Sequence, residues 1–312
     1  MYDITIIGGA VVDILAAPVD EKIFSVGSLP MDTIKMSFGG DALNEAVILG
    51  RLGKKVQLIT KVGSDEAGKR VVSFLRDNRI SLEGVAIQKD LATGINLVLV
   101  DGKGERHFLT NPQGSLRKLA LEDVECHIGH AARIVCLASM FVSPMLGISQ
   151  MRQLFSKIKE RERILAVDMT KAKNKETLKD IQELLPYIDY IFPNEEEIYL
   201  LTGEKDACKN ALHLVEGGVK TAVVKCGDRG CVVADQTGVR VIPAVKANRC
   251  VDTTGAGDSF AAGFLWGISE GLSTEACARF ACAAASCAVE QYGATEGIHS
   301  LEKVKERFLL GR

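Results

Sequence analysis

The alternation of strand and helix patterns in the second half of the chain constrains the fold more than any other feature. Short apolar runs predict buried strands at 134–138, 164–167, 190–192 and 221–225. One helix is expected to follow the first run to about Arg161, and another to end at Ile181 to Leu185. Strands that alternate with helices form a parallel, doubly wound α/β sheet with helices on both faces, and ligands bind at the carboxyl ends of its strands.

The first half of the chain instead predicts short β-strands joined by turns. Asp101-Gly102-Lys103-Gly104 is typical of a hairpin turn between two such strands. We expect a small, separate sheet, or lid, formed by segments at about 12–18, 33–38 and 95–110, and the strand pattern at 85–88 is a further candidate for it. Because no linker or repeat interrupts the pattern, we expect a single domain over residues 1–312 with the lid strands inserted in it.

Composition excludes several classes of protein. The formal net charge of -2 gives no electrostatic basis for binding nucleic acid. No apolar run approaches the length of a membrane span, and the N-terminus lacks the basic start of a secretion signal. The nine cysteines include no Cys-x-x-Cys pair, which indicates reduced thiols in a cytoplasmic protein and argues against a zinc site.

The segment from Asp252 to Phe260 reads Asp-Thr-Thr-Gly-Ala-Gly-Asp-Ser-Phe, and a helix is predicted to begin at about Gly257. A glycine turn that opens a helix leaves unpaired N–H groups at the positive end of the helix dipole, where anions bind. Asp258 would repel a bound phosphate unless it accepts the proton of the attacking group. Amides that stabilise an anion beside a base suit phosphoryl transfer to a hydroxyl, whereas the alternative is an ordinary helix cap.

A second glycine segment, Gly39-Gly40-Asp41-Ala42-Leu43-Asn44, lies between a predicted strand and a predicted helix. Paired glycines allow a small polar ligand to contact the main chain, and the Asn44 amide can both donate and accept hydrogen bonds. Asp13 lies between Val12 and Ile14, so in a strand its side chain points away from these apolar neighbours. Asp13 is therefore either a solvent-facing acid or a carboxylate that binds a ligand.

Together these segments resemble the two signatures of the ribokinase-like, or PfkB, family of sugar kinases, and the resemblance extends from Ile4 to about Gly297. It implies an ATP-dependent kinase that uses Mg²⁺, with the lid over the sugar and a homodimer formed through the lid. It also implies that Gly255, Ala256 and Gly257 form the anion hole for the transferred phosphoryl group. Asp258 would be the base that activates the substrate hydroxyl.

The resemblance implies roles for further residues. The sugar would contact Asp13, Gly39, Gly40, Asn44 and Arg106, although Arg106 alternatively faces water. The nucleotide would lie along Asn194, Lys225, Gly227, Gly230 and Cys282. Glu197 would act on Mg²⁺ through water, and a monovalent cation, expected to be K⁺, would be bound by Asp252 and Thr254 and by main-chain oxygens of Ala288, Gln291 and Gly293. Helix capping by Asn194 and Glu197, a hairpin turn at 227–230 and tight helix packing at Cys282 are the structural alternatives.

The expected acceptor is a primary hydroxyl of a small, ribose- or fructose-like sugar. Two positions differ from the ribose-binding members of the family. Val142 stands before Ser143-Pro144 in place of a glutamate, and Val11-Val12-Asp13 stands in place of Asn-Ala-Asp.

Three alternatives stay open. A phosphosugar acceptor requires basic residues, for which Lys171, Lys173 and Lys175 are candidates. A nucleoside acceptor requires a stacking aromatic, for which Phe108 and Phe141 are candidates. A non-catalytic sugar sensor on the same fold would not need Asp258.

Overall fold

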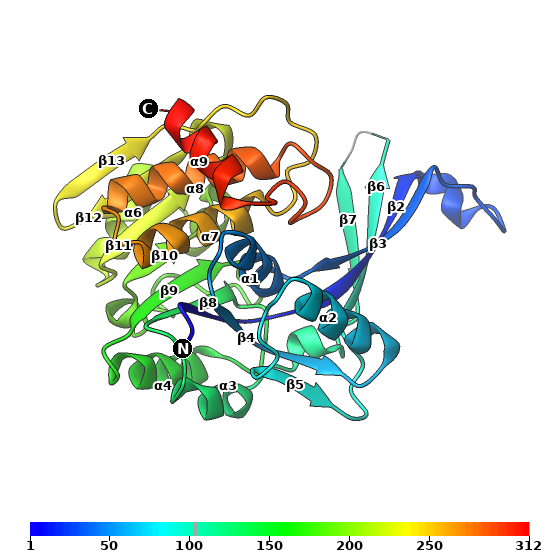
Figure 1. Ribbon diagram of the computed structural model, residues 1–312, viewed down its shortest axis with the longest axis horizontal. Coiled ribbons are helices and arrows are strands. Elements are labelled where there is room, and N and C mark those ends of the chain that lie inside the picture. The colour runs from blue at the N-terminus through cyan, green and yellow to red at the C-terminus, as the bar shows by residue number, and fades with distance from the viewer. Residues whose placement is uncertain (103–104, 312) are drawn as a thin grey trace.

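The computed structural model describes residues 1–102 and 105–311, and a nine-stranded sheet runs through its main body (Figure 1). The strand order is β13-β12-β11-β10-β9-β8-β1-β4-β5, parallel except where β12 pairs with β11 and β13. The bounds are β1 (Ile4–Ile7), β4 (Val56–Gly63), β5 (Val85–Gln88), β8 (Ile134–Met140), β9 (Ile164–Met169), β10 (Tyr190–Phe192), β11 (Thr221–Lys225), β12 (Cys231–Asp235) and β13 (Gly238–Ile242). The predicted doubly wound α/β architecture is confirmed.

The sheet divides the hydrophobic core into two layers. Within β1, Ile4 and Ile6 enter one layer and Ile7 enters the other, as the two-residue period of a strand requires. The first layer is covered by α1 (Asp41–Arg51), α2 (Glu66–Asp77), α7 (Ala256–Ser269), α8 (Thr274–Ala288) and α9 (Leu301–Leu310). The second is covered by α3 (Leu121–Ile128), α4 (Ile148–Lys159), α5 (Glu195–Thr202) and α6 (Ala207–Glu216).

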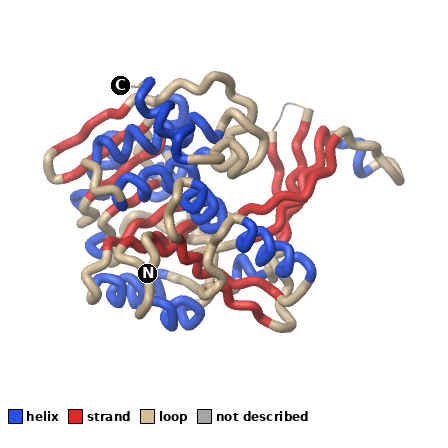
Figure 2. The backbone as a smooth tube through the Cα atoms, viewed as in Figure 1, coloured by secondary structure: helices blue, strands red, loops and turns tan. Residues whose placement is uncertain are grey.

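The lid projects from one end of the body, as the tube view makes plain (Figure 2). It contains β2 (Val11–Val19), β3 (Thr33–Gly39), β6 (Ile95–Asp101) and β7 (Arg106–Thr110) in the order β3-β2-β6-β7. These strands confirm the predicted small sheet, and β6 and β7 pair as an antiparallel hairpin. Lys103 and Gly104 of the predicted turn lie outside the described residues.

Two secondary-structure predictions are wrong. The strand at 85–88 is not part of the lid, because β5 pairs in parallel with β4 at the edge of the main sheet. The segment before β10 forms turns and a short 3₁₀ helix (Leu185–Tyr187) instead of the α-helix predicted to end there. Its backbone hydrogen bonds join residues three apart, as from the Leu184 amide to the Ile181 carbonyl. Pro186 has no N–H with which to continue a helix.

All nine cysteines are free thiols, in agreement with the reduced state expected from their spacing. In the described part of the chain, no helix combines the length and the apolarity that crossing a membrane requires.

Candidate active site

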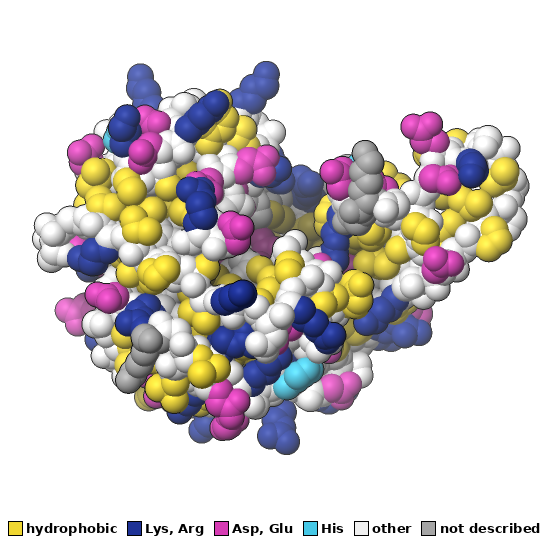
Figure 3. Space-filling model, turned by 90° about the horizontal axis from the view of Figure 1, so that it is seen from above, with side chains coloured by type: hydrophobic (Ala, Val, Ile, Leu, Met, Phe, Trp, Pro, Cys, Tyr) yellow, Lys and Arg dark blue, Asp and Glu magenta, His cyan; other side chains and the backbone are white. Residues whose placement is uncertain are grey.

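The predicted catalytic residues lie where α1 and α7 begin, beside the carboxyl ends of the central strands. The surface is hollowed between the body and the projecting lid (Figure 3). Asn44, in the first turn of α1, donates a hydrogen bond of 2.6 Å from Nδ2 to Oδ2 of Asp258 in the first turn of α7. The two signature segments, far apart in sequence, therefore meet in one site.

The glycine turn before α7 has the backbone that the sequence predicted. Gly255 adopts φ +71°, and a Cβ atom there would lie 2.1 Å from the carbonyl oxygen of Ala294. The amide of Ala256 donates to the carbonyl of Thr253 at 3.2 Å, within the turn itself. Among the described residues, the amides of Gly255 and Gly257 have no acceptor, so these two N–H groups are free for an anion.

Asp258 lies half-buried among other acids. Burial raises the pKa of Asp258 to about 8, and the negative charges of Asp41 and Asp168 act in the same direction. The hydrogen bond from Asn44 and the charge of Lys225 oppose this rise. A carboxylate whose pKa lies near neutrality can both accept and release a proton, as a general base must.

Lys225, at the end of β11, carries the positive charge of the site. Its Nζ donates to Oδ1 of Asp168 at 2.7 Å, and both side chains are almost completely buried. Burial alone would lower the pKa of Lys225, but Asp168 and Glu197 hold it well above its ordinary value. A Cβ atom on Gly257 would lie 3.5 Å from this ammonium group, so Lys225 faces the turn that opens α7.

Glu197 and Asn194 form a capping box at the start of α5, which is the structural alternative for this pair. The Asn194 side chain accepts from the Glu197 amide at 2.8 Å, and the Glu197 carboxylate accepts from the Asn194 amide at 2.7 Å. Glu197 also belongs to the acidic cluster. Its burial raises its pKa to about 7, which Lys225 opposes and Asp168 supports. Carboxylates that repel one another around the Lys225 ammonium group fit Mg²⁺, which binds carboxylate oxygens and keeps several waters.

The structure adds acids that the sequence alone did not assign. Asp41 follows the glycine pair and accepts a hydrogen bond from Ser139, a residue with φ +63° at the end of β8. Asp168 is the second-last residue of β9. Its position near a strand end is the sequence feature that could have identified it as a site residue. Glu45 is fully buried, with both oxygens unpaired among the described residues. Burial and then the charge of Asp168 raise its pKa well above the ordinary value.

A cavity of about 520 Å³ opens beside the turn, and this is the size of a small-molecule site. Lys225, Gly227, Gly230 and Cys282 line it, as the sequence predicted for the nucleotide. Ala256, Gly257 and Phe260 of α7 also line it, so the cavity leads directly to the free amides. Asn194 is not among its lining residues but bridges to Lys225 on the neighbouring strand.

The predicted acceptor residues lie at the base of the lid. The amide of Asn96 donates to the Asp13 carboxylate at 2.8 Å. A Cβ atom on Gly39 would lie 2.1 Å from the Asp13 carboxylate, and one on Gly40 would lie 2.5 Å from the Gly9 carbonyl. Close packing within the chain therefore already requires both glycines.

Cross-strand pairing places Arg106 on the same face of the lid as Asp13 and Asn96. Its guanidinium group does not lie free at the acceptor, because Nη2 donates to Oδ1 of Asp252 at 2.6 Å. Burial raises the pKa of Asp13, and the nearby charge of Arg106 opposes that rise. Arg106 thus lies between the acceptor side of the lid and the loop that precedes α7.

The residues predicted to bind a monovalent cation come together, and Asp252 among them already pairs with Arg106. Oδ1 of Asp252 accepts from Arg106, from the Thr254 amide at 2.9 Å and from the Thr254 hydroxyl at 2.7 Å. Oδ2 accepts from the Gly293 amide at 2.9 Å. The carbonyl of Ala288 accepts from the Gln291 amide at 3.5 Å. Four donors thus reach the Asp252 carboxylate, three of them on Oδ1 and one on Oδ2, and the cation among them is Arg106.

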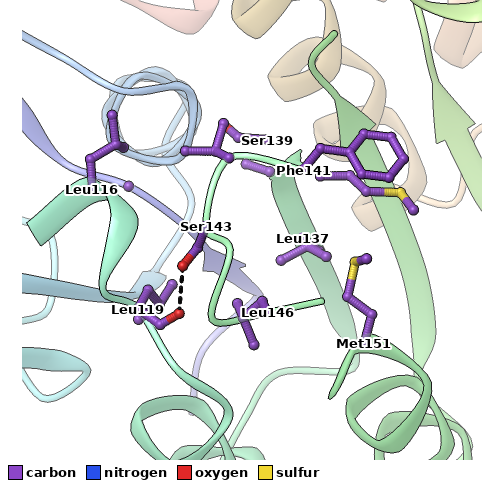
Figure 4. A pocket seen from close by; sticks show the side chains of 13 residues that line it. Leu116, Leu119, Leu137, Ser139, Phe141, Ser143, Leu146 and Met151 are labelled. Carbon is purple, nitrogen blue, oxygen red and sulfur yellow. Dashed lines mark hydrogen bonds between the residues drawn. The ribbon is translucent and has the colours of Figure 1, made fainter. Parts of the chain in front are cut away.

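A second hollow, near Gly8 and Gly9, is too small for a sugar. Its volume of about 20 Å³ has room for about one water. Figure 4 shows it enclosed by apolar side chains, with the Ser143 hydroxyl donating to the carbonyl of Leu119 at 2.8 Å. Ser143, next to the unexpected Val142, is therefore held by the protein itself.

Comparison with known proteins agrees with this geometry. The family model described as "pfkB family carbohydrate kinase" matches residues 1–301. An uncharacterized sugar kinase of Archaeoglobus fulgidus is 30% identical over 251 residues, which are 80% of this chain and 97% of the relative. A ribokinase of Haemophilus influenzae is 28% identical over 279 residues, 87% of each chain. The structure of Arabidopsis thaliana ribokinase complexed with ribose and ATP has a TM-score of 0.82 and 25% identity, and the match covers 98% of both chains.

Proposed function

Because the chain belongs to the pfkB family of carbohydrate kinases, an ATP-dependent kinase family, we propose that it transfers the γ-phosphoryl group of ATP to a primary hydroxyl of a small, ribose- or fructose-like sugar. One observation carries this proposal. Asp258 lies half-buried at the N-terminus of α7, hydrogen-bonded to Asn44, in a helix whose first residues line a cavity of nucleotide size.

The chemistry is an in-line transfer. Asp258 accepts the proton of the acceptor hydroxyl as its oxygen forms a bond to the γ-phosphorus, and the bond from that phosphorus to the leaving oxygen of ADP breaks. The amides of Gly255 and Gly257 and the ammonium group of Lys225 stabilise the charge on the phosphoryl oxygens. Mg²⁺, when bound with ATP, neutralises phosphate charge. Glu197 would hold it through water, beside Asp168.

Carboxylates at the acceptor side favour a ligand rich in hydroxyl groups. Asp13, held by Asn96, and Asp41, held by Ser139, both have acceptor oxygens for sugar hydroxyls. Negative charge on these two carboxylates repels an acceptor that carries a carboxylate or phosphate at this position. A neutral sugar is therefore the first candidate.

A phosphorylated sugar is the second candidate, because two cations lie near these acids. Burial and the neighbouring charge of Arg117 lower the pKa of Lys173, and the charges of Asp41 and Glu197 oppose this. Nε of Arg117 is buried and has no partner among the described residues. Lys171 is not available for this role, because it pairs with Glu196 at 2.6 Å.

We also propose a homodimer formed through the outer face of the lid. Met36, Ile14, Leu97 and Leu109 form a cross-strand row on the face opposite Asp13. Met36, Leu97 and Leu109 are 46%, 41% and 55% exposed, and Ile34 on the same face is 73% exposed. A second copy would cover this apolar face. Sedimentation of wild type and of Leu97→Lys checks it: a dimer that the variant converts to a monomer supports the proposal, and a wild-type monomer contradicts it.

The acceptor is identified by ADP release over a panel of pentoses, hexoses, nucleosides and their phosphates, with ATP and Mg²⁺ present. Asp258→Asn serves as the catalytic control, and ATP binding by calorimetry shows that the variant is folded. A sugar that responds with wild type and not with the variant supports the proposal. ATP binding without a response to any acceptor favours a non-catalytic sensor. A response to nucleosides would support base stacking on Phe108, which lies on the same face of the lid as Asp13.

A further inference from the structure

The contact between Arg106 and Asp252 joins the lid to the loop that precedes α7. Arg106 begins β7 of the lid, whereas Asp252 lies in the loop that leads to α7. In Figure 1 the upper end of β7 lies beside the loops around α8 and α9. The side chain of Asp252 is only 6% exposed and that of Arg106 is 24% exposed, so the ion pair is largely shielded from water.

Asp252 holds together the loops on which the anion site depends. Its carboxylate binds the Thr254 amide on one side and the Gly293 amide on the other. Gly293 precedes Ala294, whose carbonyl oxygen packs against Gly255. Burial alone would raise the pKa of Asp252, but these amides, the Thr254 hydroxyl and Arg106 lower it. The carboxylate is therefore charged, and Arg106 is the cation that lies against it.

We propose that Arg106 supplies this charge in place of a bound monovalent cation, and so positions the turn at 253–257 from the lid. The geometry supports the substitution because the guanidinium group contacts Oδ1 of Asp252 at 2.6 Å, on the oxygen that also accepts from Thr254, while the Gly293 amide donates to Oδ2. Arg106 is then a positioning residue for the proposed phosphoryl site. Only this role of Arg106 rests on the proposed function.

The test uses thermal unfolding of the full chain with ATP and Mg²⁺, in KCl and in choline chloride at equal ionic strength. The wild-type Tm is expected to be the same in both salts. Arg106→Ala is expected to lose a few degrees in choline and to regain most of them in K⁺, because a cation can then reach the vacated position on Asp252. Arg106→Lys is expected to retain the wild-type behaviour in part.

Arg240→Ala is the matched control. Arg240 pairs with Asp235 between β12 and β13, and its side chain is 33% exposed. Its loss should lower the Tm equally in both salts. A K⁺-specific rise of the wild-type Tm overturns the proposal, as does an Arg106→Ala loss that neither K⁺ nor Arg106→Lys restores. The assay requires no sugar acceptor, so its result can be interpreted even if the proposed acceptor is wrong.

Discussion

Asn44 and Asp258 are 214 residues apart in the chain, yet the amide of the first donates a 2.6 Å hydrogen bond to the carboxylate of the second. The bond joins the first turns of α1 and α7, two helices that pack on the same side of the sheet. It orients the proposed base and favours its charged form, because a donated hydrogen bond stabilises a carboxylate.

Replacement of Asn44 by alanine is expected to shift the pH dependence of turnover. Without the donor, the pKa of Asp258 rises further above about 8, so the acid limb of the kcat/KM profile moves to higher pH. The lost charged hydrogen bond, worth about 1.5–3 kcal/mol, lowers activity by roughly 10- to 100-fold at neutral pH. Asn210→Ala removes another buried amide, which bonds Thr202 and Glu204 far from the site, and it should lower stability without moving the acid limb. An unmoved limb in Asn44→Ala would contradict the assignment of Asp258 as the base.

Replacement of Asp258 by asparagine should remove activity and increase stability. Loss of a general base lowers kcat by at least about 10²-fold. The pKa of Asp258 is higher in the folded protein than its ordinary 3.8, so the folded state binds this proton more tightly and the free energy of unfolding falls as pH rises from 3.8 to about 8. Asparagine carries no such charge, so the variant should have the higher Tm at pH 8 and above. The difference should vanish toward pH 3.8. A variant that melts below wild type at high pH would show that the carboxylate is stabilised by contacts that asparagine cannot make.

The sequence predicted the site best where one short segment builds a complete local structure. The turn at 252–258 and the glycine pair at 39–40 carry their backbone geometry in their own residues, and both were located correctly. The capping box of Asn194 and Glu197 is likewise local and was anticipated as an alternative.

Predictions that depended on distant partners were less successful. Nothing near Arg106 in the sequence indicates Asp252, and that carboxylate also accepts from Gly293 of a third segment. The acidic cluster around Asp258 likewise combines α1, β9 and α5, so Asp41 could not be assigned from its position beside Gly40. In the fold, the strand at 85–88 has a pattern that suits either sheet, and only its pairing with β4 decides between them.

Two glycines of the same turn are expected to respond differently to alanine. A Cβ atom on Gly257 meets only the Lys225 ammonium group, at 3.5 Å, and alanine is favoured over glycine in a helix by about 1 kcal/mol. Gly257→Ala should therefore fold with a Tm at or above that of wild type, yet lose phosphoryl transfer because its methyl group occupies the anion hole. Gly255→Ala should unfold more readily, since its Cβ atom would lie 2.1 Å from the Ala294 carbonyl at φ +71°. Full activity in Gly257→Ala would place the transferred group elsewhere.

Variants of the buried pair of Lys225 and Asp168 should separate the contribution of the pair to stability from its contribution to catalysis. Lys225→Met leaves Asp168 without its cation, and breaking a buried ion pair costs about 3–5 kcal/mol of unfolding free energy. Asp168→Asn in the same chain removes the unpaired charge, so the double variant should recover much of the lost Tm. Activity should not return, because the ammonium group that faces Gly257 is still absent. Urea unfolding of the four proteins of this cycle gives the coupling free energy of the pair, and kcat measured on the same samples gives its catalytic share. If the double variant recovers activity together with stability, Lys225 only balances Asp168, and charge stabilisation of the phosphoryl group must come from the amides of Gly255 and Gly257.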